Sequence, residues 1–198
     1  SIDVVVNNAG YGLIGPFEEY SSEQIEKQFK TNVMGLMDVC KEIIPLFRKQ
    51  KYGTIVNISS IAGKVTFPFY SAYHASKWAI EGFSESLQIE LKPFNIRVKI
   101  IEPGAIKTDF YGRSADSTKI PGSAYEHLFS QALLVMHKSV AHGVNPEIVA
   151  EVIYKAAQSK GSRLRYAVGM DAKIVILFRR FITDRMWHWL MRMVLFKK

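Results

Sequence analysis

Tyr73 and Lys77 are the pair of side chains in this sequence that could carry acid–base chemistry. They lie four residues apart in a segment with a helical pattern, so both side chains project from one face of the predicted helix. A tyrosine works as a general acid or base only if its pKa falls from about 10 toward about 7. A neighbouring ammonium group favours the phenolate and lowers that pKa. One such pair is expected by chance in a chain of this composition, so its meaning depends on its surroundings.

Polar and glycine-rich turns follow three predicted strands. Each strand is a short run rich in β-branched residues: residues 2–6 before Asn7-Asn8-Ala9-Gly10, residues 54–58 before Ser59-Ser60, and residues 96–101 before Pro103-Gly104. The carboxyl ends of parallel strands meet at one edge of a sheet, where ligands bind. We therefore expect these turns to line one crevice.

Strands and long helices alternate along the chain. The Val/Ile runs lack polar alternation, which is typical of strands buried on both faces of a parallel sheet. Helices are predicted over residues 21–50, 70–92 and 145–158, with a fourth strand over residues 164–169. This order predicts an α/β fold, a Rossmann-type doubly wound parallel sheet. Because a fully buried strand opens the chain, we expect the preceding units of that sheet to be absent from it.

These motifs, taken in order, resemble the classical short-chain dehydrogenase/reductase family. The shared features are the Asn-Asn-Ala-Gly turn, the helix residue Asn32, a serine before the tyrosine, Tyr-x-x-x-Lys, and a Pro-Gly-x-x-x-Thr turn ending at Thr108. The resemblance covers residues 1 to about 110 and continues more loosely to Gly169. It implies a cytoplasmic oxidoreductase that interconverts a carbonyl and an alcohol, assembled as a homo-dimer or homo-tetramer.

The resemblance also implies a role for each matching residue. Tyr73 would exchange a proton with the reacting oxygen, Lys77 would lower the pKa of Tyr73 and bond the nicotinamide ribose, and Ser60 would hydrogen-bond the same oxygen. Asn32 would hold a water that links Lys77 to solvent. The cofactor-binding residues it implies are Asn8, Ala9, Gly10, Tyr73, Lys77, Pro103, Gly104, Ile106 and Thr108.

The sequence departs from the family pattern at its beginning. The family's glycine-rich pyrophosphate turn does not occur in it, nor does the strand whose residue separates NAD from NADP. We therefore expect residues 1–170 to form a partial dinucleotide-binding domain, with NADP preferred over NAD as the cofactor. The alternative function is a truncated, non-catalytic module that binds a partner or a membrane.

Residues 111–144 occupy the position of the family's variable substrate lid. They become apolar from Leu128 to Met136. An apolar lid favours a hydrophobic substrate, such as a steroid, a retinoid, or a long-chain acyl or sphingoid carbonyl. The alternative is a lid that only packs on its own core.

The net charge of +8 comes from the end of the chain. Residues 160–198 contain 10 Lys and Arg against 2 Asp, whereas residues 1–159 contain 16 of each sign. A neutral main domain argues against nucleic-acid binding. Residues 171–198 predict a basic amphipathic tail, with a second helix capped by Thr183-Asp184. This tail could lie on a membrane surface, cover a subunit interface, or cover the substrate entrance.

The remaining candidates point to no further chemistry. Cys40 is the single cysteine and is expected in the core. His74 is expected mainly to pack rather than to touch substrate. No metal site is expected, because His127, His137 and His142 lack metal-ligand spacing. Neither a signal peptide nor an apolar run long enough for a transmembrane helix is visible.

Overall fold

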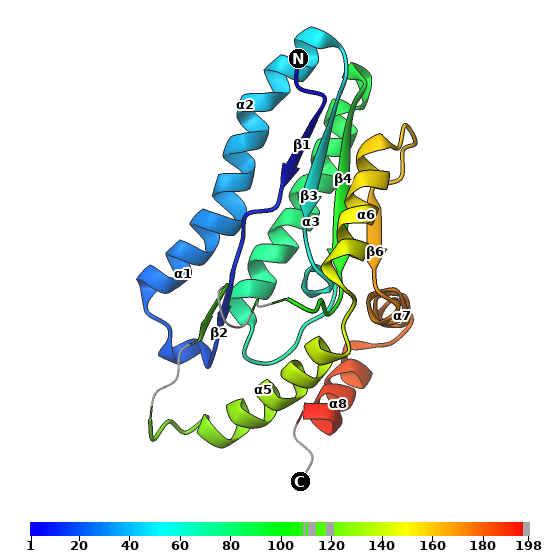
Figure 1. The fold of residues 1–198 in the computed structure, drawn as a ribbon. Coiled ribbons are helices and arrows are strands. Elements are labelled where there is room, and N and C mark those ends of the chain that lie inside the picture. Colours follow the sequence, from blue (N-terminus) through cyan, green and yellow to red (C-terminus); the bar gives the residue numbers. More distant parts are fainter. Residues whose placement is uncertain (109, 111–113, 118–120, 196–198) are drawn as a thin grey trace.

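A parallel sheet forms the centre of the molecule (Figure 1). The structure, a computed structural model, describes residues 1–108, 110, 114–117 and 121–195. The four strands of the sheet, in spatial order, are β1 (Val4–Asn7), β3 (Gly53–Ile58), β4 (Ile96–Pro103) and β6 (Arg165–Val168). Each neighbouring pair is parallel, so the four carboxyl ends meet at one edge. The predicted parallel α/β sheet is confirmed.

Helices cover both faces of this sheet. α2 (Gly35–Gln50) and α3 (Ser71–Leu91) pack on one face, and α6 (Pro146–Gln158) packs on the other (Figure 1). In β3, Ile55 points into the α2–α3 core while Val56 points into the α6 core. This is the two-sided burial expected when successive strand residues face opposite ways. β3 and β4 are therefore buried on both faces, as predicted.

β1 is less buried than predicted. Val4 and Val6 are 37% and 42% exposed, whereas Val5 packs against the α2–α3 core. β1 stands at the end of the strand order, next to β3. An edge strand with one covered face alternates in burial. The expectation that this strand is buried on both faces is therefore wrong for these residues.

The helix predicted over residues 21–50 is interrupted. α1 (Ser22–Phe29) begins after Ser21, whose hydroxyl accepts a hydrogen bond from the Gln24 N–H in a capping box. A π-helical turn over Lys30–Met34 then leads into α2. Such turns insert an extra residue and are frequent at functional sites. Asn32 lies in this turn.

A second group of elements lies beside the carboxyl edge of the sheet (Figure 1). β2 (Gly12–Ile14) pairs with β5 (Ala115–Ser117), a short ladder that was not predicted. α5 (Glu126–Ala141), α7 (Met170–Arg179) and α8 (Asp184–Leu195) follow (Figure 1). Thr183 caps α8 as predicted, because its hydroxyl accepts from the Met186 N–H. None of the described helices is long and apolar enough to cross a membrane.

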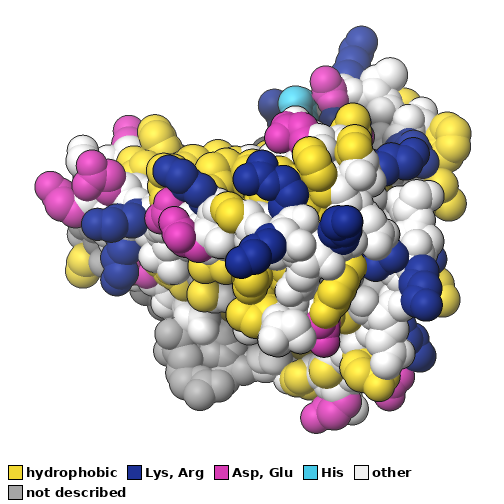
Figure 2. All heavy atoms as spheres, turned by 90° about the horizontal axis from the view of Figure 1, so that it is seen from above, with side chains coloured by type: hydrophobic (Ala, Val, Ile, Leu, Met, Phe, Trp, Pro, Cys, Tyr) yellow, Lys and Arg dark blue, Asp and Glu magenta, His cyan; other side chains and the backbone are white. Residues whose placement is uncertain are grey.

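The predicted boundaries of the main domain (1–170), the lid (111–144) and the tail (171–198) stay predictions. Positions 111–113 and 118–120 of the lid, and 196–198 of the tail, lie outside the described residues. On the face of the molecule drawn in Figure 2, basic side chains are spaced among hydrophobic and acidic ones.

Candidate active site

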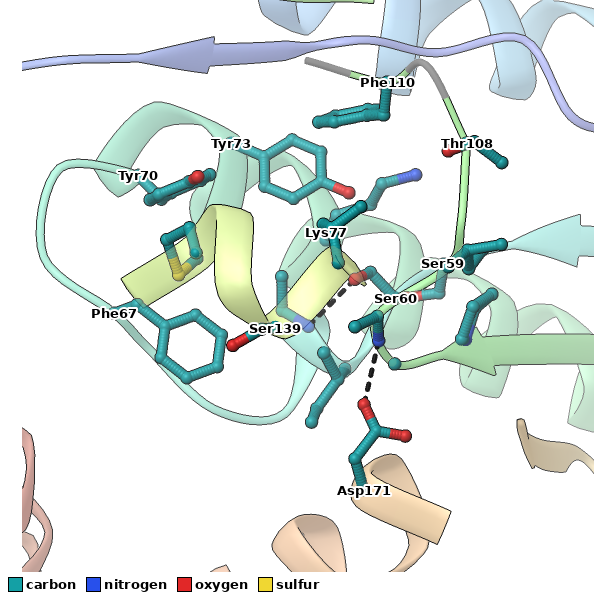
Figure 3. A pocket seen from close by; sticks show the side chains of 18 of the residues that line it. Ser59, Ser60, Phe67, Tyr70, Tyr73, Lys77, Thr108, Phe110, Ser139 and Asp171 are labelled. Carbon is teal, nitrogen blue, oxygen red and sulfur yellow. Dashed lines mark hydrogen bonds between the residues drawn. The ribbon is translucent and has the colours of Figure 1, made fainter. Parts of the chain in front are cut away.

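A cavity of about 580 Å³ opens at the carboxyl edge of the sheet. Most of the predicted site residues line it: Asn8, Gly10, Ser60, Tyr73, Lys77, Pro103, Gly104, Ile106 and Thr108. Tyr73, Lys77 and Ser60 come together from α3 and the end of β3, among the aromatic rings of Phe67, Tyr70 and Phe110 (Figure 3). Ala9 and Asn32 are outside the lining.

Lys77 is buried at the inner end of the cavity. Its ammonium group donates a hydrogen bond to the Ile58 carbonyl oxygen at 3.0 Å and lies 5.7 Å from the centre of the Tyr73 ring. Burial lowers the pKa of Lys77 to about 8, against the opposing effect of the Glu81 carboxylate. Because this pKa is close to neutral pH, a small change in the nearby charges or in solvation changes the fraction of Lys77 that is protonated.

Asn32 fastens the turn after β1 to α3. Its amide nitrogen donates to the Tyr11 carbonyl oxygen at 2.8 Å and to the Ser76 hydroxyl at 3.2 Å, and its oxygen accepts from the Tyr11 N–H at 3.0 Å. A Cβ atom on Gly10 would lie 3.2 Å from Asn32 Oδ1 and 3.8 Å from Lys77 Nζ. Gly10 therefore lets the turn approach both residues. The water relay through Asn32 stays a prediction.

Ser60 and His74 both contact the turn at residues 61–63, but only Ser60 lines the cavity. The Ser60 hydroxyl accepts from the Ala62 N–H at 3.1 Å and still carries an O–H that can donate into the cavity. His74 is buried: Nδ1 lies 2.8 Å from the Ala62 carbonyl oxygen, and Nε2 accepts from the Phe67 N–H at 2.8 Å. Burial lowers the pKa of His74, which suits this neutral arrangement. His74 thus packs and holds the turn, as expected.

The turn over residues 103–108 is held by contacts that the sequence analysis missed. The Gly104 N–H donates to the Val168 carbonyl oxygen, the Ala105 N–H donates to Asp171 Oδ2, and the Lys107 N–H donates to the Val144 carbonyl oxygen, at 2.8–2.9 Å. Figure 3 shows Asp171 reaching this turn from α7. A Cβ atom on Gly104 or Gly169 would overlap the Asp171 carboxylate. The pattern in the sequence that could have indicated this contact is Gly169-x-Asp171, a glycine followed by an acidic residue at the start of a helix.

The tail and the lid both line the cavity. Val175 of α7, Met191 and Val194 of α8, and several α5 side chains, among them Val135 and Met136, contribute to its wall. Trp187 of α8 is buried, and its indole N–H donates to the Thr66 carbonyl oxygen at 3.1 Å. Of the three predicted positions for the tail, these contacts favour the substrate entrance.

The residues at the inner end of the cavity suit the nicotinamide half of a dinucleotide. They offer an ammonium group on Lys77 and hydroxyls on Tyr73 and Thr108. Among the described residues, no group of three His, Cys, Asp or Glu side chains is placed to hold a metal ion. Cys40 is buried in the α2–α3 core, as predicted.

Comparison with known proteins points in one direction. The family model for short chain dehydrogenases matches residues 1–119. The chain is 39% identical to an uncharacterized oxidoreductase, YusZ, of Bacillus subtilis over 98% of this chain and 71% of that one. It is 33% identical to a 3-ketodihydrosphingosine reductase of Bacteroides thetaiotaomicron over 96% of this chain and 72% of that one. A short-chain dehydrogenase from Streptomyces avermitilis superposes with a TM-score of 0.80 at 33% identity, covering 96% of this chain and 68% of the other.

Proposed function

The chain belongs to the short-chain dehydrogenase/reductase family, whose members are oxidoreductases that use NAD or NADP, and we propose that it interconverts a hydrophobic ketone or aldehyde and its alcohol with Tyr73 as the acid–base group. The convergence of Ser60, Tyr73 and Lys77 on one cavity carries this proposal. A non-catalytic module would not need a buried lysine beside a tyrosine at the inner end of a cavity.

Each polar group has one task in this mechanism. In reduction, the Tyr73 hydroxyl gives its proton to the carbonyl oxygen, while the Ser60 O–H donates a hydrogen bond to that oxygen as negative charge develops on it. The Lys77 ammonium stabilises the tyrosinate that remains. Lys77 then gives a proton to the tyrosinate, and a water held by Asn32 replaces the proton on Lys77, so that the Tyr73 hydroxyl is restored. In oxidation the same groups act in reverse.

The cofactor supplies or accepts the hydride when it is bound. Asn8, Ala9 and Gly10 would line its adenosine-ribose side, Lys77 its nicotinamide ribose, and Ile106 and Thr108 its carboxamide. We propose NADP as the preferred cofactor. Fluorescence titration of the natural full-length protein with NADPH and NADH tests this choice, and tighter binding of NADH would contradict it.

The substrate proposed for this cavity is a long-chain lipid carbonyl. Apart from Ser139 and Asp171, the side chains that α5, α7 and α8 contribute to the lining of the cavity are apolar, which favours an apolar substrate. A relative at 33% identity carries the name 3-ketodihydrosphingosine reductase, whose substrate is a lipid ketone. Both observations support a substrate with a long apolar chain.

We expect kcat/KM to rise with the chain length of a ketone series. Each added methylene that is buried contributes about 0.8 kcal/mol, or roughly fourfold in kcat/KM, until the cavity is full. Met136→Gln should flatten this dependence, because Met136 lines the cavity. The control is Leu134→Gln, also on α5, where the side chain is 64% exposed and outside the lining. Turnover that is independent of chain length would contradict a lipid substrate.

The outer side of the tail is proposed to rest on an anionic membrane surface. Large apolar side chains are exposed along α7, α8 and the turn between them, namely Ile174, Leu177, Phe178, Phe181, Met186, Trp189 and Met193. The basic side chains of the tail alternate with them in the sequence: Lys173, Arg179, Arg180, Arg185 and Arg192. Exposed aromatic and basic residues together fit the boundary between lipid headgroups and acyl chains. A lipid substrate would then enter next to its source.

Vesicle co-sedimentation tests this surface. The protein should bind vesicles that contain anionic lipid, bind neutral vesicles less, and lose binding as salt is added. Phe181→Ser combined with Trp189→Ser should weaken binding at least tenfold, since each removes a large exposed aromatic group. Ile89→Ser is the control, because Ile89 is exposed on α3. Equal sedimentation of all variants would exclude the tail as the docking surface and leave a subunit interface as its use.

A further inference from the structure

Two buried carboxyl groups lie outside the lining of the cavity, and one of them, Glu81, acts on Lys77 by its charge. Glu81 is one helical turn beyond Lys77 on α3 and is 3% exposed, and Glu102, near the end of β4, is 2% exposed. Buried acidic residues are uncommon unless they are paired with other groups. Neither residue has a task in the mechanism above.

The partners of the two carboxyl groups are unequal. Glu81 Oε2 accepts from Lys64 Nζ at 3.0 Å and from Arg165 Nε at 2.9 Å, whereas Glu102 Oε1 lies 3.5 Å from Arg165 Nε. Glu81 Oε1 and Glu102 Oε1 are both buried without a hydrogen-bond partner when both groups are drawn as carboxylates. One proton between them would satisfy these atoms and remove the repulsion between two buried negative charges.

The groups around Glu102 favour the protonated form of its carboxyl group. Burial is the main cause that raises the pKa of Glu102 to about 7, and the charge of Glu81 adds to it. Lys64 and Arg165 act in the opposite direction but do not offset burial. The titratable groups that face the pair are Lys77 and Glu85 from α3, Lys64 after the turn at residues 61–63, and Arg165 from β6.

Glu81 also connects this pair to the catalytic cavity. Its charge opposes the loss of the Lys77 proton that burial favours. Its side chain packs against the turn that carries Ser60, since a Cβ atom on Gly63 would lie 2.9 Å from Glu81 Cγ and 2.8 Å from Ser59 Oγ. A single charge placed here acts on Lys77 through a buried, poorly solvated region.

We propose that Glu81 and Glu102 share one proton, and that the single negative charge left on the pair holds Lys77 as an ammonium ion beside Tyr73. The proposal rests on the proposed function, because it assigns the pair a role through Lys77. Glu81 and Glu102 are positioning residues that do not touch substrate or cofactor. Arg165 and Lys64 hold Glu81 in place.

The kinetic test compares Glu81→Gln with the unchanged full-length protein. Carbonyl reduction is measured as a function of pH, because its alkaline limb reports the loss of a proton from the Tyr73–Lys77 pair. Glu81→Gln removes the carboxylate whose charge opposes the loss of the Lys77 proton, so that limb should move to lower pH by roughly one unit. The control, Glu85→Gln, removes a carboxylate that also bonds Arg165 but is more than half exposed, and should leave the limb in place. An equal loss of rate at every pH would overturn the proposal.

The second test does not depend on activity. A carboxyl group whose pKa is raised in the folded state stabilises the fold at low pH, and that contribution is lost as the pH rises toward about 7. The thermal unfolding midpoint of the unchanged protein should therefore fall as the pH rises toward about 7. In Glu102→Gln, whose side chain cannot ionise, this part of the fall should be absent. If Glu102→Gln keeps the same pH dependence, no proton is shared. This readout decides the proton sharing even if Glu81→Gln does not fold or Tyr73 has no catalytic role.

Discussion

Tyr73→Phe is expected to lower kcat/KM for carbonyl reduction by roughly 10³-fold in the natural full-length protein, because it removes the proton donor. The Tyr73 ring lies among Tyr70, His74 and Phe110, with centres 6.1–6.4 Å apart, and phenylalanine keeps those contacts. Cofactor affinity should change little. The measurement is steady-state kinetics together with cofactor titration and the unfolding midpoint.

Tyr154→Phe provides the matched control for this substitution. Tyr154 is exposed on α6 and lies outside the cavity, so the same loss of a hydroxyl should leave turnover unchanged. If Tyr73→Phe retains full activity while folding normally, Tyr73 is not the acid–base group and the proposed mechanism fails.

Lys77→Met is expected to reduce activity by roughly 10²-fold to 10³-fold while making the folded protein more stable. Without the ammonium group the pKa of Tyr73 rises, so alcohol oxidation at neutral pH is lost and part of it returns at alkaline pH. Burial lowers the pKa of Lys77 from 10.5 to about 8, so the folded state disfavours the charged lysine at neutral pH. An apolar side chain of similar length removes that cost.

The stability gain has a defined pH window. The unfolded chain holds the lysine proton more tightly than the folded protein between about pH 8 and pH 10.5, so the stability contributed by this group rises with pH across that range. At neutral pH, Lys77→Met should raise the free energy of unfolding by about 1–3 kcal/mol, the upper end being the full pKa difference. Lys155→Met, on the exposed side of α6, should change neither property. A less stable but active Lys77→Met variant would contradict the role given to this lysine.

The contrast between Lys77 and Asp171 shows which contacts a sequence can predict. Lys77 follows Tyr73 at a spacing that has meaning on any helix, so the spacing alone places both side chains on one face. Asp171 accepts from the Ala105 N–H across 66 positions of sequence, and no local spacing connects the two. The tail resembles an appendage in the sequence for the same reason, although Val175 and Met191 form part of the cavity wall.

By itself, the sequence determined the order of strands and helices and the polar strand ends, and its resemblance to the family implied the candidate catalytic set. Periodicity, caps and turn residues act over a few neighbouring positions and are therefore visible in a linear chain. Only the tertiary structure decided that β1 is half exposed, that α7 and α8 line the cavity, and that Glu81 interacts with Glu102. These features depend on which segments, distant in the sequence, contact each other and on how much the residues between them are exposed to water. Tertiary packing determines both, and no pattern over a few neighbouring residues predicts them.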